Sequence, residues 1–174
     1  MIIASSTTTT TTTTTATNCI AGWVHFDVNG NCYRYMDTKL SWNDAKKSCQ
    51  SFNGINNGNL ASIPDEATNY FLKRFGDTKP KWIGGHYFIT GGEWKWSDGT
   101  PWSYTKWGKN YPKNSKGKDY LSMFGDDGIW GDYFEVGLLE FICQYKPTNT
   151  ATSITTAPTT TATTTTTSGK NVQS

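Results

Sequence analysis

All 25 aromatic residues of the chain and all four of its cysteines lie within residues 18–147. Residues 1–17 and 148–174 consist largely of threonine, with serine and alanine, and contain no aromatic residue. Such tails cannot bury enough apolar surface to offset the conformational entropy lost on folding, so both are expected to be disordered. The block between them has the size of one ordinary domain. The sequence therefore predicts one folded domain, 18–147, between two Thr-rich tails.

The tails have two interpretations. Thr-rich tracts beside a folded block are typical of the O-glycosylated stalks of secreted proteins, but a repeat expansion of one codon gives the same composition. The chain begins Met1-Ile2-Ile3-Ala4 and continues into serine and threonine. It lacks the apolar stretch of about 7–15 residues that forms the core of a secretory signal. We therefore expect either a cytosolic protein or a secreted one whose natural start differs.

Charge and hydropathy exclude two classes of partner. The formal net charge of +2 is too small for a protein with a broad nucleic-acid-binding surface. A helix that crosses a membrane needs about 18 consecutive apolar residues, and the chain has no such run. We expect no nucleic-acid partner and no membrane span.

Residues 41–52 have the periodicity of an amphipathic helix. The apolar positions at helical spacing are Trp42, Ala45, Cys49 and Phe52. Ser41 and Asp44 have the spacing of a capping box, with aspartate in place of the usual glutamate. The pattern predicts a helix that turns Cys49 toward the core.

A second helix is predicted across residues 64–75. Ser62 is expected to cap its first turn, and the acidic side chains of Asp65 and Glu66 suit the positive end of the helix dipole. Gly76 suits the exit from the helix, because glycine readily adopts the left-handed conformation found there.

After residue 80 the chain consists of short apolar runs separated by glycine, which is typical of strands. The predicted strands are 81–85, 93–96, 129–134 and 138–145. Residues 98–128 have little periodicity and predict a long irregular loop, and loops of that length are usually functional. Two helices followed by strands indicate an α+β domain.

Ordered landmarks along the block resemble those of the C-type lectin-like domain family. They are 19–26 with 32–33, 42–45 with Cys49, 60–63, 82–85, 94–99, Trp107, 130–132 and 141–143. The resemblance covers almost all of residues 19–147. It implies the family's α+β fold, with two helices, antiparallel strands and a long irregular binding loop. It also implies a binding module for a carbohydrate or a protein surface.

Four cysteines allow three pairings, and a cytosolic protein would keep them as free thiols. The resemblance implies the pairs Cys19–Cys32 and Cys49–Cys143. Disulfides form in oxidising compartments, so an extracellular, secreted protein becomes the better interpretation. A further disulfide usual in the family is missing, because its positions carry Tyr120 and Glu135. We expect a softer loop base there, which a hydrogen bond between these two side chains could bridge.

The resemblance also locates the family's principal calcium site. Sugar-binding members hold the ion with a Glu-Pro-Asn or Gln-Pro-Asp triplet, a following glutamate and an Asn-Asp pair. Here those positions carry 111–113 (Tyr-Pro-Lys), Lys118 and 131–132 (Gly-Asp). Lysine offers no acceptor to calcium, and its charge repels a dication. We therefore expect no metal and no calcium cofactor.

The auxiliary calcium site of the family is also degraded. Its early carboxylates align with Tyr87 and Gly91, while Asn114 and Asp119 persist. The resemblance therefore leaves too few carboxylates at either position for the usual calcium shell.

Charge is segregated along the loop. Residues 106–118 hold five lysines and no acid, whereas 119–135 hold five acids and no base. In one interpretation the two segments form ion pairs that replace calcium as a clamp; in the other the lysines form a face for an anionic ligand, such as a sulfated or sialylated glycan. The candidate ligand-binding residues are Trp107, Tyr111, Lys113, Lys118, Asp119 and Asp132.

No residue pattern indicates catalysis. The two histidines, His25 and His86, stand beside no nucleophile motif, and 126–127 (Asp-Asp) lies in a Gly-flanked turn that is expected to be solvated. We expect a non-catalytic, calcium-independent binding module. The alternatives are a structural, mucin-like secreted protein whose lectin fold has no glycan ligand, and a conventional calcium-dependent lectin.

Overall fold

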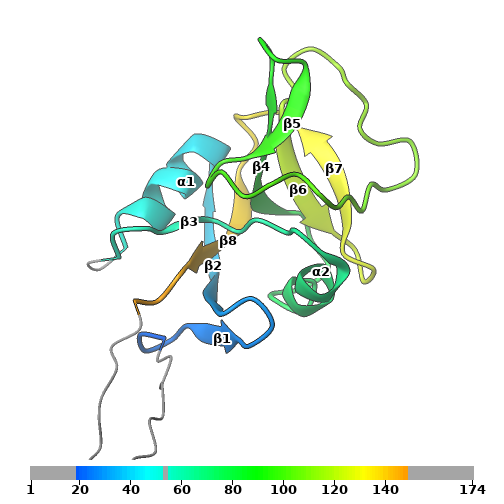
Figure 1. Ribbon diagram of the computed structural model, residues 1–174. Helices are drawn as coiled ribbons and strands as arrows, with labels where there is room; N and C mark the ends of the chain where they lie inside the picture. Colours follow the sequence, from blue (N-terminus) through cyan, green and yellow to red (C-terminus); the bar gives the residue numbers. More distant parts are fainter. Residues whose placement is uncertain (1–18, 53–54, 149–174) are drawn as a thin grey trace, which may run out of the picture. The chain divides into compact units, whose positions relative to one another are not determined.

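The computed structural model of the protein describes residues 19–52 and 55–148 (Figure 1). The predicted domain, 18–147, is therefore described almost throughout. The tails predicted to be disordered, 1–17 and 148–174, lie outside the described residues except for Thr148. Among the described residues, no helix combines the length and the apolar composition needed to cross a membrane.

The described residues form two helices and eight strands. The helices are α1 (Trp42–Gln50) and α2 (Glu66–Leu72). The strands are β1 (Val24–Phe26), β2 (Asn31–Leu40), β3 (Asn59–Leu60), β4 (Lys81–Phe88), β5 (Glu93–Trp96), β6 (Tyr120–Phe124), β7 (Ile129–Tyr133) and β8 (Leu139–Tyr145). The predicted α+β class is confirmed.

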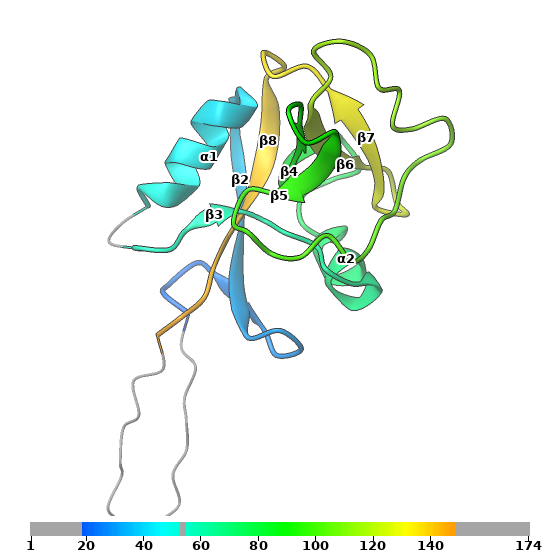
Figure 2. The same cartoon turned by 45° about the horizontal axis from the view of Figure 1, so that its top comes forward.

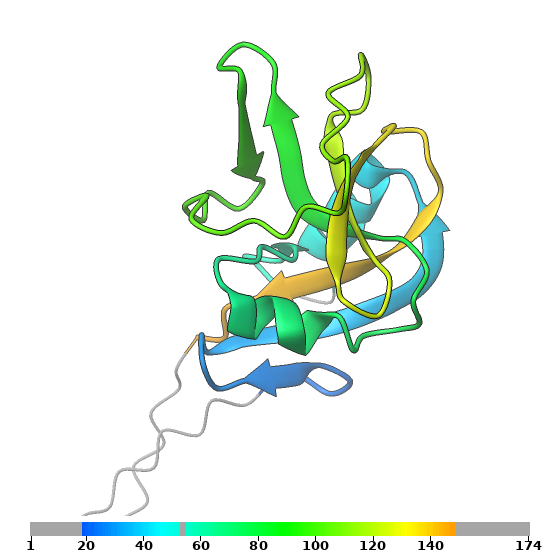
Figure 3. The ribbon, with the colours of Figure 1, turned by 90° about the vertical axis from the view of Figure 1, so that its right-hand side faces the viewer.

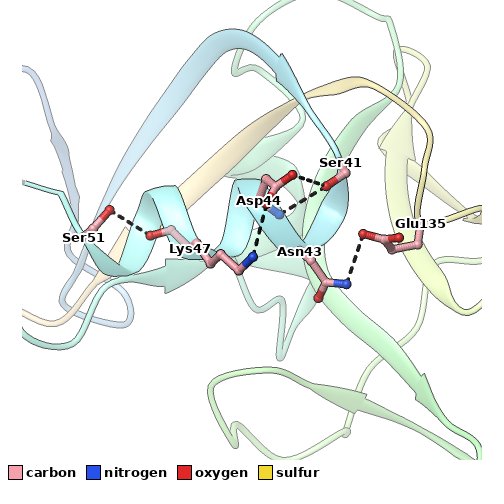
Figure 4. Close-up of polar contacts among 6 residues, drawn as sticks. All are labelled: Ser41, Asn43, Asp44, Lys47, Ser51 and Glu135. Atoms are coloured by element: carbon pink, nitrogen blue, oxygen red, sulfur yellow. Dashed lines mark hydrogen bonds and ion pairs between the residues drawn. The ribbon is translucent and has the colours of Figure 1, made fainter.

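Helix α1 begins where the capping box predicts. The Ser41 hydroxyl oxygen accepts a hydrogen bond from the backbone N–H of Asp44 at 3.3 Å and donates to its carboxylate at 2.8 Å (Figure 4). At the other end, the Ser51 hydroxyl donates to the carbonyl oxygen of Lys47 at 2.9 Å. Trp42, Ala45 and Cys49 are buried, so the helix turns its apolar side toward the core as its spacing indicates. The helix ends at Gln50 rather than at residue 52, so Phe52 lies outside it and is only partly buried against the core.

Helix α2 is shorter than predicted, and its predicted cap is wrong. Asp65 is the N-cap, because its carboxylate accepts a hydrogen bond from the backbone N–H of Thr68 at 2.7 Å. Ser62 instead lies in the extended segment before the helix, where its hydroxyl donates to Asp98 at 2.8 Å. Gly76 has a φ of 70°, the left-handed conformation expected at the exit.

One twisted sheet joins the strands in the order β1-β2-β8-β4-β6-β7, with β3 beside β8 and β5 beside β4. The strands pair antiparallel, as predicted, except that β4 and β8 pair in parallel at Lys81–Glu140 and Trp82–Phe141. Strand β8 lies between β2 and β4, so this short pairing connects the two antiparallel halves of the sheet.

The irregular loop is also shorter than predicted. Residues 120–124 of the predicted loop, 98–128, form β6, which pairs with β4 and β7. The strand has only five residues, three of them buried in succession, so the sequence shows no alternation of apolar and polar residues that would identify it. The irregular segment that connects β5 to β6 is therefore 97–119, and its middle is joined to β7 by a bridge between Trp107 and Trp130.

Both disulfides implied by the resemblance are present. Cys19 bonds to Cys32 within the amino-terminal hairpin, and Cys49 of α1 bonds to Cys143 of β8. The second bond lies in a core cluster with Trp42, where both sulfur-bearing residues are fully buried. It joins the helix layer to the centre of the sheet.

Three connections gather at one end of the domain (Figures 1, 2 and 3). They are the β4–β5 turn (89–92), the last part of the long loop (114–119) and the β7–β8 loop (134–138); the earlier part of the long loop runs past α2, where Lys106 pairs with Glu66. The described chain begins and ends at the opposite end, beside β1 (Figure 3). We call the first end the distal end.

Candidate ligand-binding site

Asp132 ties the long loop to the sheet. It lies on β7 with 1% of its surface exposed. Its two carboxylate oxygens accept hydrogen bonds from the backbone N–H groups of Lys113 at 2.8 Å and Asn114 at 3.0 Å. Asn114 itself has a positive φ of 50°. The carboxylate therefore acts as the anchor of the loop.

The residues at the principal calcium position do not fit a calcium ion. Calcium is held by six to eight oxygen atoms. Both oxygens of Asp132 already accept from backbone N–H groups. The ammonium group of Lys113 lies 5.3 Å from the ring centre of Tyr111, and that of Lys118 lies 5.1 Å from the ring centre of Phe134. These positions present hydrogen-bond donors and cations where the ion needs acceptors. In the described residues, no group of three or more His, Cys, Asp or Glu side chains could hold a metal ion.

A groove of about 310 Å³ opens between the β4–β5 hairpin and the long loop. Its residues are Tyr87, Ile89 and Trp94 from the hairpin and 114–119 from the loop. The rings of Tyr87 and Trp94 meet edge to face at 5.6 Å. Trp107 supports Trp94 from the other side, with ring centres 5.1 Å apart. The groove therefore has an aromatic wall and a polar, lysine-bearing wall.

The predicted site residues do not form one cluster. Lys118 and Asp119 line the groove, and Lys113 precedes its first loop residue. Tyr111 and Asp132 line a separate, smaller cavity of about 110 Å³ beside β6 and β7. Trp107 packs among other tryptophans.

Sequence reasoning missed part of the aromatic wall. In the sequence, Trp94 stands out only as part of a family landmark, and Lys116 only as one of the five lysines in 106–118. The alternation of side chains along β5 places Trp94 on the same face of the strand as the buried Trp96, because residues two positions apart in a strand share a face. Trp94 is nevertheless half-buried, since it lies at the edge where the hairpin leaves the sheet. Tyr87 faces it across the hairpin.

The lysines do not clamp the acidic segment through ion pairs. Lys106 pairs with Glu66 of α2 at 2.9 Å. Within the part of the chain that the structure describes, no ion pair joins 106–118 to 119–135. The proposed ion pairs between the two segments are therefore not formed. The acidic segment still holds the loop, because Asp132 accepts hydrogen bonds from the backbone N–H groups of Lys113 and Asn114. The ammonium groups of the loop remain available to a ligand.

The two positions of the missing disulfide find other partners. Tyr120 packs on Trp42 of α1 with ring centres 4.8 Å apart. Glu135 accepts a hydrogen bond from the Asn43 amide at 3.0 Å (Figure 4). Its carbonyl oxygen accepts from the backbone N–H of Trp42 at 3.2 Å. The suggested hydrogen bond between Tyr120 and Glu135 is absent from the described residues. Helix α1 supports both strand ends instead.

Neither histidine lines the groove. His25 contacts the exposed carboxylate of Asp27 at 2.8 Å. His86 lies on β4 against Trp42, and burial lowers the pKa of its imidazole. The carboxylates of Asp126 and Asp127 are exposed in a turn, as predicted.

Known proteins place the chain in a family. Residues 38–145 match the family model of the lectin C-type domain. The chain is 31% identical over 136 residues to the alpha-N-acetylgalactosamine-specific lectin of Patiria pectinifera, covering 73% of this chain and 80% of that protein. It is 34% identical over 122 residues to lithostathine of Rattus norvegicus, covering 66% of this chain and 72% of the relative.

Solved structures agree with the family model. Human lithostathine superposes with a TM-score of 0.66 at 26% identity, covering 74% of this chain and 91% of that one. A calcium-independent type II antifreeze protein superposes with a TM-score of 0.67 at 26% identity, covering 75% and 96% of the two chains. The chain therefore belongs to the C-type lectin family, whose domains are generally non-catalytic binding modules.

Proposed function

We propose that this C-type lectin domain binds an anionic saccharide in the groove between the β4–β5 hairpin and the loop segment 114–119, without calcium. One observation carries the proposal: aromatic rings face lysines across a groove at the distal end. Pyranose rings have apolar faces that pack on aromatic side chains, and sulfate or carboxylate substituents pair with ammonium groups.

Each wall of the groove has a role in this proposal. Tyr87 and Trp94 pack against the sugar ring, while Lys116 and Lys118 bind its anionic substituent. Asn114 and Asp119 contribute oxygen atoms for sugar hydroxyls. The Asp132 anchor holds the loop wall in place, so binding does not require calcium to order the loop. Similarity to a protein named as a sugar-specific lectin supports a saccharide ligand.

Replacing Lys116 and Lys118 together by glutamate is expected to weaken binding to sulfated or sialylated glycans by at least about tenfold. Hydrogen bonds to charged groups contribute about 1.5–3 kcal/mol each, and about 1.4 kcal/mol corresponds to a factor of ten. A glycan array followed by titration calorimetry gives the measurement. Binding of the unmodified protein should also weaken as salt is raised, because exposed charges are screened.

Lys47→Glu provides the matched control for this experiment. Lys47 lies on α1 and forms a surface ion pair with Asp44, so its loss should affect stability and binding little. If the double variant binds the same glycans with unchanged affinity, the groove is not the site. If no glycan binds the unmodified protein, the mucin-like alternative is favoured, and the Thr-rich tails already provide a composition that suits it.

Millimolar calcium is expected to leave the melting temperature unchanged. An ion that binds only the native state at about a hundredfold excess over its dissociation constant would stabilise it by about 2.7 kcal/mol. The lysines and the engaged carboxylate at the principal position remove that linkage. Differential scanning fluorimetry with calcium and then with chelator checks this; a reversible rise of several degrees would contradict the proposal.

We also infer an extracellular location. Both disulfides are of the kind that oxidising compartments maintain, and Cys49–Cys143 is buried in the core.

A further inference from the structure

Large apolar side chains project from the distal end. Ile89 in the β4–β5 turn is 74% exposed, and Val136 and Leu138 in the β7–β8 loop are 77% and 64% exposed. We call these three side chains the apolar tips. They lie on two separate turns that flank the groove at the same end of the domain (Figures 1 and 3). A saccharide in the groove requires neither Val136 nor Leu138, because neither residue lines it.

The β7–β8 loop that carries two of these tips is held in a defined conformation. Its base is fixed to α1 by the hydrogen bond between Glu135 and Asn43 (Figure 4) and by a second bond from the backbone N–H of Trp42 to the Glu135 carbonyl oxygen. The backbone N–H of Gly137 donates to the carbonyl oxygen of Phe134 at 3.0 Å, which closes a tight turn. Polar contacts therefore support the loop from below, while its apolar side chains point to solvent. Preorganisation of this kind reduces the entropy lost when the loop binds a partner.

Lys118 lies between the apolar tips, and two further lysines of the long loop are exposed. Lys118 lines the groove together with Ile89, and its ammonium group lies over the ring of Phe134 in the β7–β8 loop. Lys113 and Lys116 are exposed on the long loop, 97–119. In the described residues, none of these three lysines forms an ion pair. Of the acids around them, Asp132 is buried against backbone N–H groups and Glu135 is bonded to Asn43, while Asp119 lines the groove.

We propose that the distal end binds the surface of an anionic lipid bilayer, with the apolar tips inserted between headgroups and the lysines against lipid phosphates. Proteins that lie at a membrane interface combine apolar side chains with flanking cations in this way. Both ends of the described chain lie at the opposite end of the domain, so they would point away from the bilayer (Figure 3). The proposal goes beyond saccharide binding, although it uses the same lysines.

A second copy of the chain is a poorer occupant of this surface. A twofold-symmetric contact places the same patch on both subunits, so the three lysines would face their own counterparts. An anionic surface instead satisfies the ammonium groups and the apolar side chains together. Self-association is therefore an outcome that the experiment must be able to detect.

Vesicle co-sedimentation of the full chain tests the proposal. We expect binding to vesicles of mixed phosphatidylcholine and phosphatidylglycerol, and several-fold weaker binding to phosphatidylcholine alone. The double variant Val136→Asp, Leu138→Asp should lower the partition coefficient for the anionic vesicles by about tenfold or more. Each replacement removes the favourable transfer of an apolar side chain into the bilayer and adds a carboxylate that the anionic lipids repel. Both residues are exposed, so circular dichroism should show an unchanged fold.

Val28→Asp is the matched control. Val28 is 66% exposed in the β1–β2 turn, at the end of the domain away from the apolar tips (Figure 3). This variant should keep its vesicle binding. Equal loss in Val28→Asp, or equal binding of the unmodified protein to neutral and anionic vesicles, would overturn the proposal. So would a concentration-dependent dimer in sedimentation velocity that the double variant abolishes without changing vesicle binding.

The glycan and membrane proposals fail separately. The Val136→Asp, Leu138→Asp variant should retain glycan affinity, whereas the Lys116→Glu, Lys118→Glu variant should lose both glycan and vesicle binding. Vesicle binding without any glycan ligand would remove the saccharide proposal alone. Glycan binding without vesicle binding would remove the membrane proposal alone.

Discussion

Replacing Cys49 and Cys143 together by serine is expected to lower the melting temperature by more than about 10 °C, and to abolish folding if the domain is only marginally stable. The bond closes a segment with a sequence separation of 94 residues, for which the chain-entropy model gives about 4–5 kcal/mol. A domain of this size has only about 5–15 kcal/mol of stability in total. Both cysteines are fully buried, so two serine hydroxyls would also enter the core. Thermal unfolding followed by circular dichroism measures the effect.

The double replacement of Cys19 and Cys32 is the control for this prediction. Their sequence separation is 13, so the same model gives about 3 kcal/mol. Cys19 is also only partly buried. A larger loss of stability in this second variant would show that loop length does not govern the difference. Peptide mapping without reduction checks the pairing itself, and a Cys19–Cys49 linkage would refute it.

Local signals predicted the elements that depend on neighbouring residues. Helix α1 has its cap at Ser41 and buries three of its four predicted apolar positions, because both features depend on contacts within one or two turns. Strand β5 has the predicted bounds, 93–96, since a turn signal follows it directly. The family landmarks added the pairing of Cys49 with Cys143, which no local pattern contains.

Features that depend on distant residues were not predictable in this way. Ser62 precedes α2 closely enough in the sequence to be its cap, yet its hydroxyl donates a hydrogen bond to Asp98, 36 residues away. Glu135 appeared as one half of a missing disulfide, whereas its partner is Asn43, 92 residues away. Strand β6 is defined by its neighbours β4 and β7 rather than by its own five residues. In each case a tertiary contact overrides a local preference.

The candidate site divides in the same manner. The expectation that binding needs no calcium rests on residue types alone, because lysine offers no acceptor to a cation. The groove could not be inferred from the sequence, because it is formed by Trp94 of the β4–β5 hairpin and Lys118 of the long loop, which are distant in the sequence. The anchoring role of Asp132 was also hidden, because its partners are backbone N–H groups, which every residue except proline has.

Asp132→Ala is expected to destabilise the domain by about 2–5 kcal/mol and to release the long loop. The change leaves the backbone N–H groups of Lys113 and Asn114 without their acceptor, and each unsatisfied group costs about 1–3 kcal/mol where it stays buried. Amide hydrogen exchange at 113 and 114 should accelerate more than exchange in β7. Glycan affinity should fall as well, because 114–119 forms one wall of the groove.

Two further variants separate the anchor from a general effect of charge. Asp132→Asn keeps one acceptor oxygen but turns an NH₂ group toward the second backbone donor, so its loss of stability should be intermediate. Asp126→Ala removes an exposed carboxylate from a turn and should change neither stability nor exchange. If Asp132→Ala melts like the unmodified protein, and its amides at 113 and 114 stay protected, the carboxylate does not hold the loop. The expected result would instead explain how an aspartate at a position that the resemblance assigns to a calcium ligand orders the loop through backbone donors, where the other such positions carry tyrosine, lysine and glycine.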